Sequence, residues 1–126
     1  MKSFINKDYI YALVGASNNP EKYGNIIFKD LTSANLKVIP VNLKESQIEG
    51  VKAYQTLSDI EDSIDVVIFV IPSKNVIEVL SEVKKLGIKK VWLQPGSESE
   101  GAIEYCKEND IECVHHACIM IEKSAI

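Results

Sequence analysis

Arginine is absent from this sequence, and all 14 of its basic residues are lysine. The planar guanidinium fork, which grips phosphate or carboxylate through two parallel hydrogen bonds, is therefore unavailable. Any phosphate bound by this chain must be held by backbone N–H groups, a helix N-terminus, hydroxyls or lysine ammonium groups. The formal net charge of −4 also argues against nucleic acid as a partner, because that binding depends on clustered cations.

Long hydrophobic runs and paired cysteines are also lacking. The longest apolar run, Val66 to Pro72, is far shorter than the about 20 residues needed to cross a bilayer. No secretory leader pattern opens the sequence, so we expect a cytoplasmic protein without a membrane partner. The three cysteines, Cys106, Cys113 and Cys118, cannot all pair and are expected to be reduced thiols. The length of 126 residues, 46% of them hydrophobic, predicts one globular domain over residues 1–126.

What is present is an alternation of short β-branched runs with helical patterns. Such alternation is typical of βαβ units and a parallel sheet. The expected strands are 11–14, 38–41, 51–54, 66–71, 91–93 and 112–114. Because parallel crossovers are nearly always right-handed, we predict an α/β fold with a Rossmann-like doubly wound parallel sheet in three layers. The expected strand order is 3-2-1-4-5, with the sixth strand added at the edge.

Three helices are expected between these strands. The first begins near Gly24, and the second carries an apolar stripe from Val76 to Leu86. Ser73 is the expected N-cap of the second helix, and Gly87 its end. The third is expected to begin at Ser97, which with Glu100 has the spacing of a capping box.

The expected topology places a ligand at the carboxyl ends of the first and fourth strands, where the strand order reverses. Gly15 directly follows the first strand, where it permits a tight turn and a close approach by a ligand. The loop up to the first helix offers backbone N–H groups, a hydroxyl, a cation and a helix N-terminus to an anion. The candidate binding residues in this loop are Gly15, Ala16, Ser17, Pro20, Lys22 and Gly24. We expect Gly15→Val to block the ligand with little unfolding.

The loop is not a dinucleotide fingerprint, since the second glycine of G-x-G-x-x-G is missing. After the second strand an NAD site needs an acidic residue, whereas this chain has Asn42 and Lys44. A neutral amide followed by a cation suits a phosphate on the ribose. Coenzyme A and NADP both carry one, so both remain candidates. The loop after the fourth strand faces the same crevice and adds Pro72, Ser73 and Asn75 as candidates.

Several segments, in their order and spacing, resemble the stand-alone CoA-binding domain proteins. That family is similar to the CoA-binding domain of the succinyl-CoA synthetase α subunit. The segments are Val14-Gly15-Ala16-Ser17 with Pro20, Lys22 and Gly24; Val38–Asn42; Ile48-Glu49-Gly50 followed by Tyr54; Asp65-Val66-Val67; Val91–Gly96; and Cys118–Glu122. The resemblance implies phosphates at the Gly15–Ser17 turn, adenine beside Asn42 and Tyr54, and a pantetheine arm passing residues 72–75.

The reactive residues near the C-terminus give a weaker indication of chemistry. The run Cys-x-His-His-x-x-Cys, residues 113–118, matches no trusted zinc spacing, so no metal is expected. No catalytic motif is visible. Cys118 follows the last strand on the ligand side of the sheet, so we keep thiol exchange with bound CoA as a hypothesis for this residue. The alternative is that Cys118 is a small buried residue without chemistry.

The sequence therefore favours a module that binds CoA or an acyl-CoA without catalysis of its own. Two alternatives are an NADP-binding reductase-type domain and a separate subunit of an acyl-CoA synthetase system. A third is a scaffold in which Tyr23, Phe28 and Tyr105 serve self-association, as in a homodimer.

Overall fold

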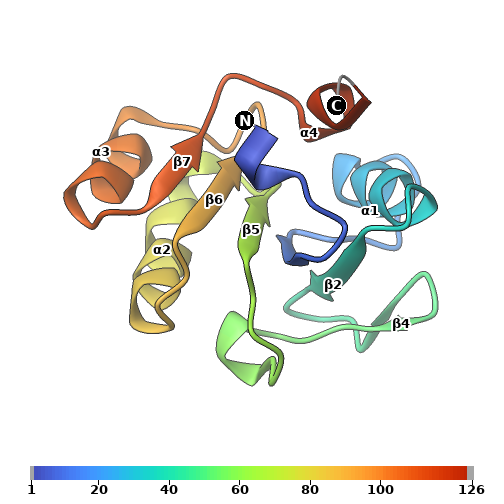
Figure 1. The fold of residues 1–126 in the computed structure, drawn as a ribbon. Coiled ribbons are helices and arrows are strands. Elements are labelled where there is room, and N and C mark those ends of the chain that lie inside the picture. Colours follow the sequence, from blue (N-terminus) through green and yellow to red (C-terminus); the bar gives the residue numbers. More distant parts are fainter. Residues whose placement is uncertain (1, 125–126) are drawn as a thin grey trace.

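Five parallel strands form the centre of the molecule in the computed structural model, which describes residues 2–124. They are β1 (Ile10–Val14), β2 (Lys37–Val41), β5 (Val66–Phe69), β6 (Lys90–Leu93) and β7 (Glu112–Val114). Their spatial order is β2-β1-β5-β6-β7, and every neighbouring pair is parallel (Figure 1). The doubly wound parallel sheet is therefore confirmed, and its order reverses between β1 and β5.

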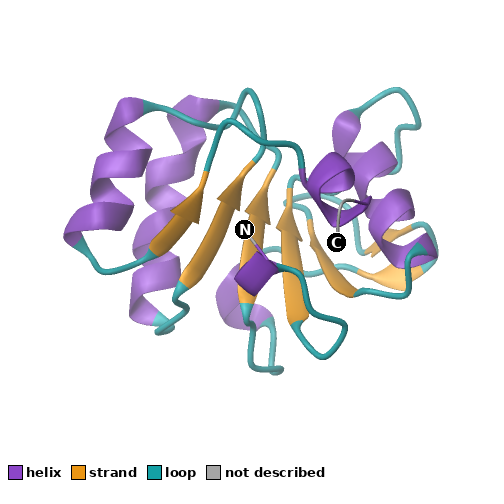
Figure 2. Ribbon diagram, turned by 45° about the horizontal axis from the view of Figure 1, so that its top comes forward, coloured by secondary structure: helices purple, strands orange, loops and turns teal. Residues whose placement is uncertain are grey.

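Helices cover both faces of this sheet and complete three layers (Figure 2). Helices α2 (Val76–Lys85) and α3 (Glu100–Glu108) pack on one face, and α1 (Tyr23–Ser33) and α4 (Ile119–Ser124) lie on the other. Two hydrophobic cores result, the first between the sheet and helices α2 and α3, the second between the sheet and helices α1 and α4. Side chains alternate along β1, so that Ala12 and Val14 lie in the first core and Tyr11 and Leu13 in the second. None of the described helices is long and apolar enough to span a membrane.

The N-terminal turn η1 (Lys2–Phe4) closes the second core. Phe4 is buried and meets the ring of Trp92 edge-on, with the centroids 6.0 Å apart. Trp92 is also fully buried, and its indole N–H donates to the carbonyl of Ala117 at 3.0 Å. That hydrogen bond fixes the chain between β7 and α4.

The prediction that residues 51–54 form a strand of the main sheet is wrong. Residues 47–52 form a separate antiparallel hairpin of β3 (Gln47–Ile48) and β4 (Val51–Lys52). Its turn residues, Glu49 and Gly50, have φ values of +49° and +78°, as a two-residue hairpin turn requires. Only Tyr54 reaches the main sheet, through a single parallel bridge to Val41. The expected strand is thus divided between a hairpin and one bridge.

Two expected helix caps are also wrong. Ser73 does not cap α2, because a short turn, η3 (Ser73–Asn75), precedes that helix and Asn75 is its N-cap residue. Helix α3 is capped by Ser99, whose hydroxyl accepts from the N–H of Ala102 at 3.0 Å. Ser97 instead exchanges hydrogen bonds with both backbone groups of Ile71. Gly87 follows α2 with a φ of +74°, as expected of a helix end.

Candidate functional site

A cavity of about 830 Å³ opens at the carboxyl ends of β1, β2 and β5, where the strand order reverses. The loops after these strands, the first turn of α1 and one face of α2 line it. Nine of the residues predicted from the sequence are among its lining residues: Gly15, Ala16, Ser17, Lys22, Gly24, Asn42, Lys44, Pro72 and Asn75. The volume lies within the range typical of pockets for small ligands, which is about 300–1,000 Å³.

Three predicted residues do not line this cavity. Pro20 lines a separate pocket, together with residues of α1. Tyr54 is half-buried, and the ammonium of Lys52 lies 5.0 Å from the centre of its ring. Ser73 sits in η3 ahead of α2. Instead of Tyr54, the residues that follow it in the chain, Gln55–Leu57, reach the cavity wall.

Gly15 and Gly24 bring α1 into direct contact with the loop after β1. Gly15 has a φ of +104°, and a Cβ there would overlap the carbonyl oxygen of Val70. A Cβ on Gly24 would overlap the carbonyl oxygen of Gly15. The expectation that Gly15→Val leaves the fold intact is therefore wrong. Both glycines are required by the packing of backbone against backbone.

The N-terminus of α1 faces the cavity without a capping side chain. Its N-cap residue, Lys22, is extended and makes no side-chain capping bond, and its first turn holds no acidic residue. The N–H groups of Tyr23 and Gly24 have no acceptor within the helix, as at every helix start. Lys22, Tyr23 and Gly24 all line the cavity. This end of the helix therefore presents free N–H groups and the positive end of the helix dipole to the cavity.

Two lysines add positive charge at the cavity rim. Lys22 and Lys44 are exposed, and neither forms an ion pair with another residue of the described chain. Both ammonium groups are thus available to an anionic ligand. The opposite wall, on α2, carries Glu78 and Glu82. Of these, Glu82 is used internally: it accepts from the N–H of Leu57 at 3.1 Å and from the hydroxyl of Ser58 at 2.7 Å.

Asn42 fixes two loops rather than offering free polar groups. Its amide N–H donates to the carbonyl of Ala16 at 2.9 Å, and its oxygen accepts from the N–H groups of Lys44 and Glu45. Ser17 stabilises its own turn, because its hydroxyl oxygen accepts from the N–H of Asn19 at 3.0 Å. These bonds hold the loops after β1 and β2 in a defined relation at the cavity mouth.

Several lining residues were missed from the sequence. Val79 and Glu82 lie one turn apart on α2, and Pro95, Gly96 and Ser97 follow β6. The sequence does indicate residues 95–97, because a Pro-Gly pair after a buried strand predicts a turn at the ligand edge of the sheet.

The cysteines and histidines lie apart from the cavity lining. Cys118 is half-buried, and its sulfur accepts from Gln94 Nε2 at 3.4 Å. Thiol exchange at Cys118 therefore stays a prediction. The hydrogen bond with Cys106, together with burial, raises the pKa of the Cys113 thiol far above its usual range, so this thiol stays protonated. Within residues 2–124, no three metal-ligating side chains converge.

Three aromatic residues were candidates for self-association. The prediction is wrong for Phe28, because this residue of α1 is buried in the second core. Tyr105 is half-buried against the other core. Tyr23 is 67% exposed and lies at the cavity mouth.

Comparison with known proteins is in agreement with this architecture. Residues 10–124 match the family model of the CoA binding domain. The α subunit of an ADP-forming acetate–CoA ligase of Pyrococcus furiosus is 42% identical over 81 residues, which are 64% of this chain and 18% of that subunit. The chain thus spans less than a fifth of the length of this relative.

Two solved structures show the same fold in different settings. A conserved hypothetical protein of Pyrococcus furiosus superimposes with a TM-score of 0.87 at 44% identity, covering 90% of this chain and 98% of that one. A dinucleotide-forming acetyl-coenzyme A synthetase of Ca. Korarchaeum cryptofilum gives a TM-score of 0.75 at 28% identity, covering 85% of this chain and 25% of that one. With the family match over residues 10–124, the chain belongs to the CoA-binding domain family.

Proposed function

We propose that this protein binds coenzyme A or an acyl-CoA in the cavity between β1, β2 and β5, without catalysis of its own. The diphosphate lies against residues 15–24, named here the phosphate loop. The observation that carries the proposal is the uncapped N-terminus of α1, which opens into a cavity that two unpaired lysines also line. Backbone donors and a helix dipole are suited to a diphosphate in a chain without arginine.

The proposed ligand fits the residues that are present. Gly15 and Gly24 both line the cavity, and neither carries a side chain that would stand between the backbone and a ligand. Lys44, in the loop that follows β2, lines the cavity where a ribose phosphate would lie in a doubly wound fold. This arrangement favours CoA over NAD, since NAD has two free ribose hydroxyls there. NADP shares the ribose phosphate, and family membership favours CoA over it.

The relatives also support a second candidate role. One relative is named as the α subunit of an acetate–CoA ligase, and this chain matches only a small part of it. A separate subunit of an acyl-CoA synthetase system is therefore the alternative to a free-standing carrier or sensor. Native mass spectrometry of freshly purified protein reads both the co-purified nucleotide and the oligomeric state.

Removing the 3′-phosphate of CoA is expected to weaken binding. Loss of one charge-assisted contact costs about 1.5–3 kcal/mol, so dephospho-CoA should bind about 10- to 100-fold more weakly in calorimetry. Lys44→Gln should remove most of this difference by weakening CoA alone. Lys37→Gln, an exposed lysine at the other end of β2, is the matched control and should change neither affinity. Equal binding of the two ligands by the wild type would remove the assigned role of Lys44.

A mixed disulfide is the expected product if Cys118 lies near the thiol end of bound CoA. The Cys118 thiolate would attack CoA disulfide, forming one protein–CoA disulfide and releasing one CoA thiol. Intact-mass measurement should then show an added CoA that reductant removes. Cys118→Ser should abolish the addition, and Cys106→Ser, at a fully buried thiol, should not. An unchanged mass in the wild type would leave Cys118 a structural residue.

A further inference from the structure

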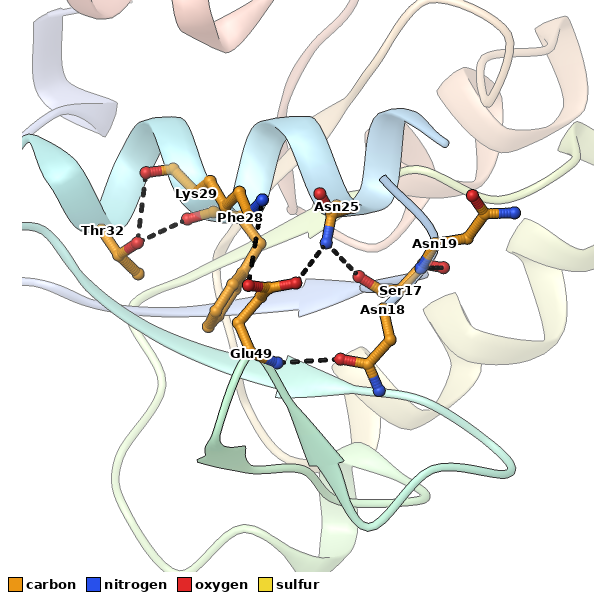
Figure 3. A network of polar contacts seen from close by, with 8 residues as sticks. All are labelled: Ser17, Asn18, Asn19, Asn25, Phe28, Lys29, Thr32 and Glu49. Carbon is orange, nitrogen blue, oxygen red and sulfur yellow. Dashed lines mark hydrogen bonds and ion pairs between the residues drawn. The ribbon is translucent and has the colours of Figure 1, made fainter. Parts of the chain in front are cut away.

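Three consecutive carbonyl groups of the phosphate loop are engaged by the protein itself. The carbonyl of Gly15 packs against the Cα of Gly24. The carbonyl of Ala16 accepts from Asn42 Nδ2, and that of Ser17 accepts from Asn25 Nδ2, both at 2.9 Å. Figure 3 shows the second of these bonds, from α1 to the loop.

These bonds fix the direction of the adjoining N–H groups. In a trans peptide the C=O and N–H point in opposite directions. The carbonyl of Ser17 is held by Asn25, so the N–H of Asn18 points away from Asn25. The carbonyl of Ala16 is held by Asn42, so the N–H of Ser17 points away from Asn42. Neither N–H has a hydrogen-bond acceptor among the described residues. Successive free N–H groups in a turn are the donors from which proteins build anion-binding concavities.

Asn25 is itself held rigidly. Its side chain is 1% exposed, and its Nδ2 also donates to Glu49 Oε2 at 2.8 Å. Glu49 forms an ion pair with Lys29 at 3.9 Å, and its N–H donates to Asn18 Oδ1 at 2.9 Å (Figure 3). The β3–β4 hairpin thus braces both Asn25 and the loop. Ser17 lines the main cavity, whereas Asn18 and Asn25 do not, so Asn25 can act on a ligand there only through the peptide that follows Ser17.

We propose that Asn25 is a positioning residue, which holds the Ser17–Asn18 peptide with its N–H toward the diphosphate. This inference rests on the proposed function and adds a residue that does not itself reach the ligand. Asn42 has the same relation to the preceding peptide. The hairpin, which lies outside the main sheet, then has a role: it fixes the Asn25 amide through Glu49.

The test separates the donor to Ser17 from the contact with Glu49. In the double variant Asn25→Asp with Glu49→Gln, the glutamine amide can donate to the aspartate, so the contact between positions 25 and 49 is kept. The donor to the Ser17 carbonyl is lost. Glu49→Gln alone is the matched control, because glutamine keeps an oxygen acceptor for Asn25. We expect CoA affinity to fall about 10- to 100-fold in the double variant, and by less than about threefold in the control.

A second readout follows the peptide directly. In amide NMR spectra of the wild type and of Glu49→Gln, addition of CoA should move the Asn18 amide proton downfield. In the double variant this movement should be absent while the melting temperature stays close to that of the control. A purely structural role for Asn25 would lower the melting temperature without this selective loss.

The outcomes distinguish the two proposals. If the wild type shows no saturable CoA binding, the proposed function and this inference fall together. If it binds CoA but the Asn18 amide proton does not move, or the double variant binds like the control, the inference alone is wrong. Should the double variant not fold, Asn25→Leu removes the same donor to Ser17 without adding a carboxylate. CoA affinity and Asn18 proton movement like those of the control in that variant would overturn the inference.

Discussion

A single methyl group added at Gly15 is expected to remove a large part of the stability of this protein. The φ of +104° is one that an alanine adopts only under strain, and the new Cβ would overlap the Val70 carbonyl oxygen and press on the Ile71 side chain. Backbone strain and overpacking together predict a loss of about 3–5 kcal/mol in the free energy of unfolding for Gly15→Ala. Typical total stabilities are only about 5–15 kcal/mol.

Gly96 provides the matched control for this effect. Its φ of +96° is nearly the same, but a Cβ there would meet nothing within 4 Å. Gly96→Ala therefore reports the backbone strain alone, which we expect to cost about 1–2 kcal/mol. Urea unfolding of both variants and the wild type measures the difference. Equal losses at the two positions would show that the contact between the β1 and β5 ends does not constrain the loop.

The fold was predictable because its evidence is local. Each buried strand is a short β-branched run, and each main helix carries its own apolar stripe, so the order of elements can be read without knowing their contacts. The right-handed crossover then leaves few topologies. The hairpin at residues 47–52 was missed because a two-residue strand gives almost no pattern, and Glu49 enters its turn with a positive φ that its residue type does not signal.

The candidate site was predictable where the chain enters it directly from a strand. Gly15 and Asn42 each follow a buried strand, so the topology alone places them together. Asn25 and Glu82 were not predictable, because each acts through a hydrogen bond to a segment distant in the sequence. A polar residue inside a helix turn is compatible with solvent exposure, and only the packing of the hairpin shows that Asn25 is buried.

Ser17→Asp is expected to change stability and CoA affinity in opposite directions. The Ser17 hydroxyl accepts a hydrogen bond from the N–H of Asn19. An aspartate carboxylate at this position can accept the same bond, so the local turn should persist. Its negative charge at the uncapped start of α1 should stabilise the fold by about 0.3–1 kcal/mol. The same charge would occupy the region proposed for the diphosphate. At an effective dielectric constant of about 20, two unit charges 4 Å apart repel by about 4 kcal/mol. CoA affinity should therefore fall by about 100-fold or more.

The other end of α1 supplies the control. Ser33 is exposed and is the last residue of the helix, so Ser33→Asp makes the same change of charge at the negative end of the dipole. It should destabilise the fold by about 0.3–1 kcal/mol and leave CoA binding nearly unchanged. Thermal unfolding and calorimetry of both variants give the two signs. If Ser17→Asp bound CoA like the wild type, the diphosphate could not lie at the phosphate loop. If instead both variants lost affinity alike, the net charge of the chain, rather than its placement at the α1 N-terminus, would govern binding.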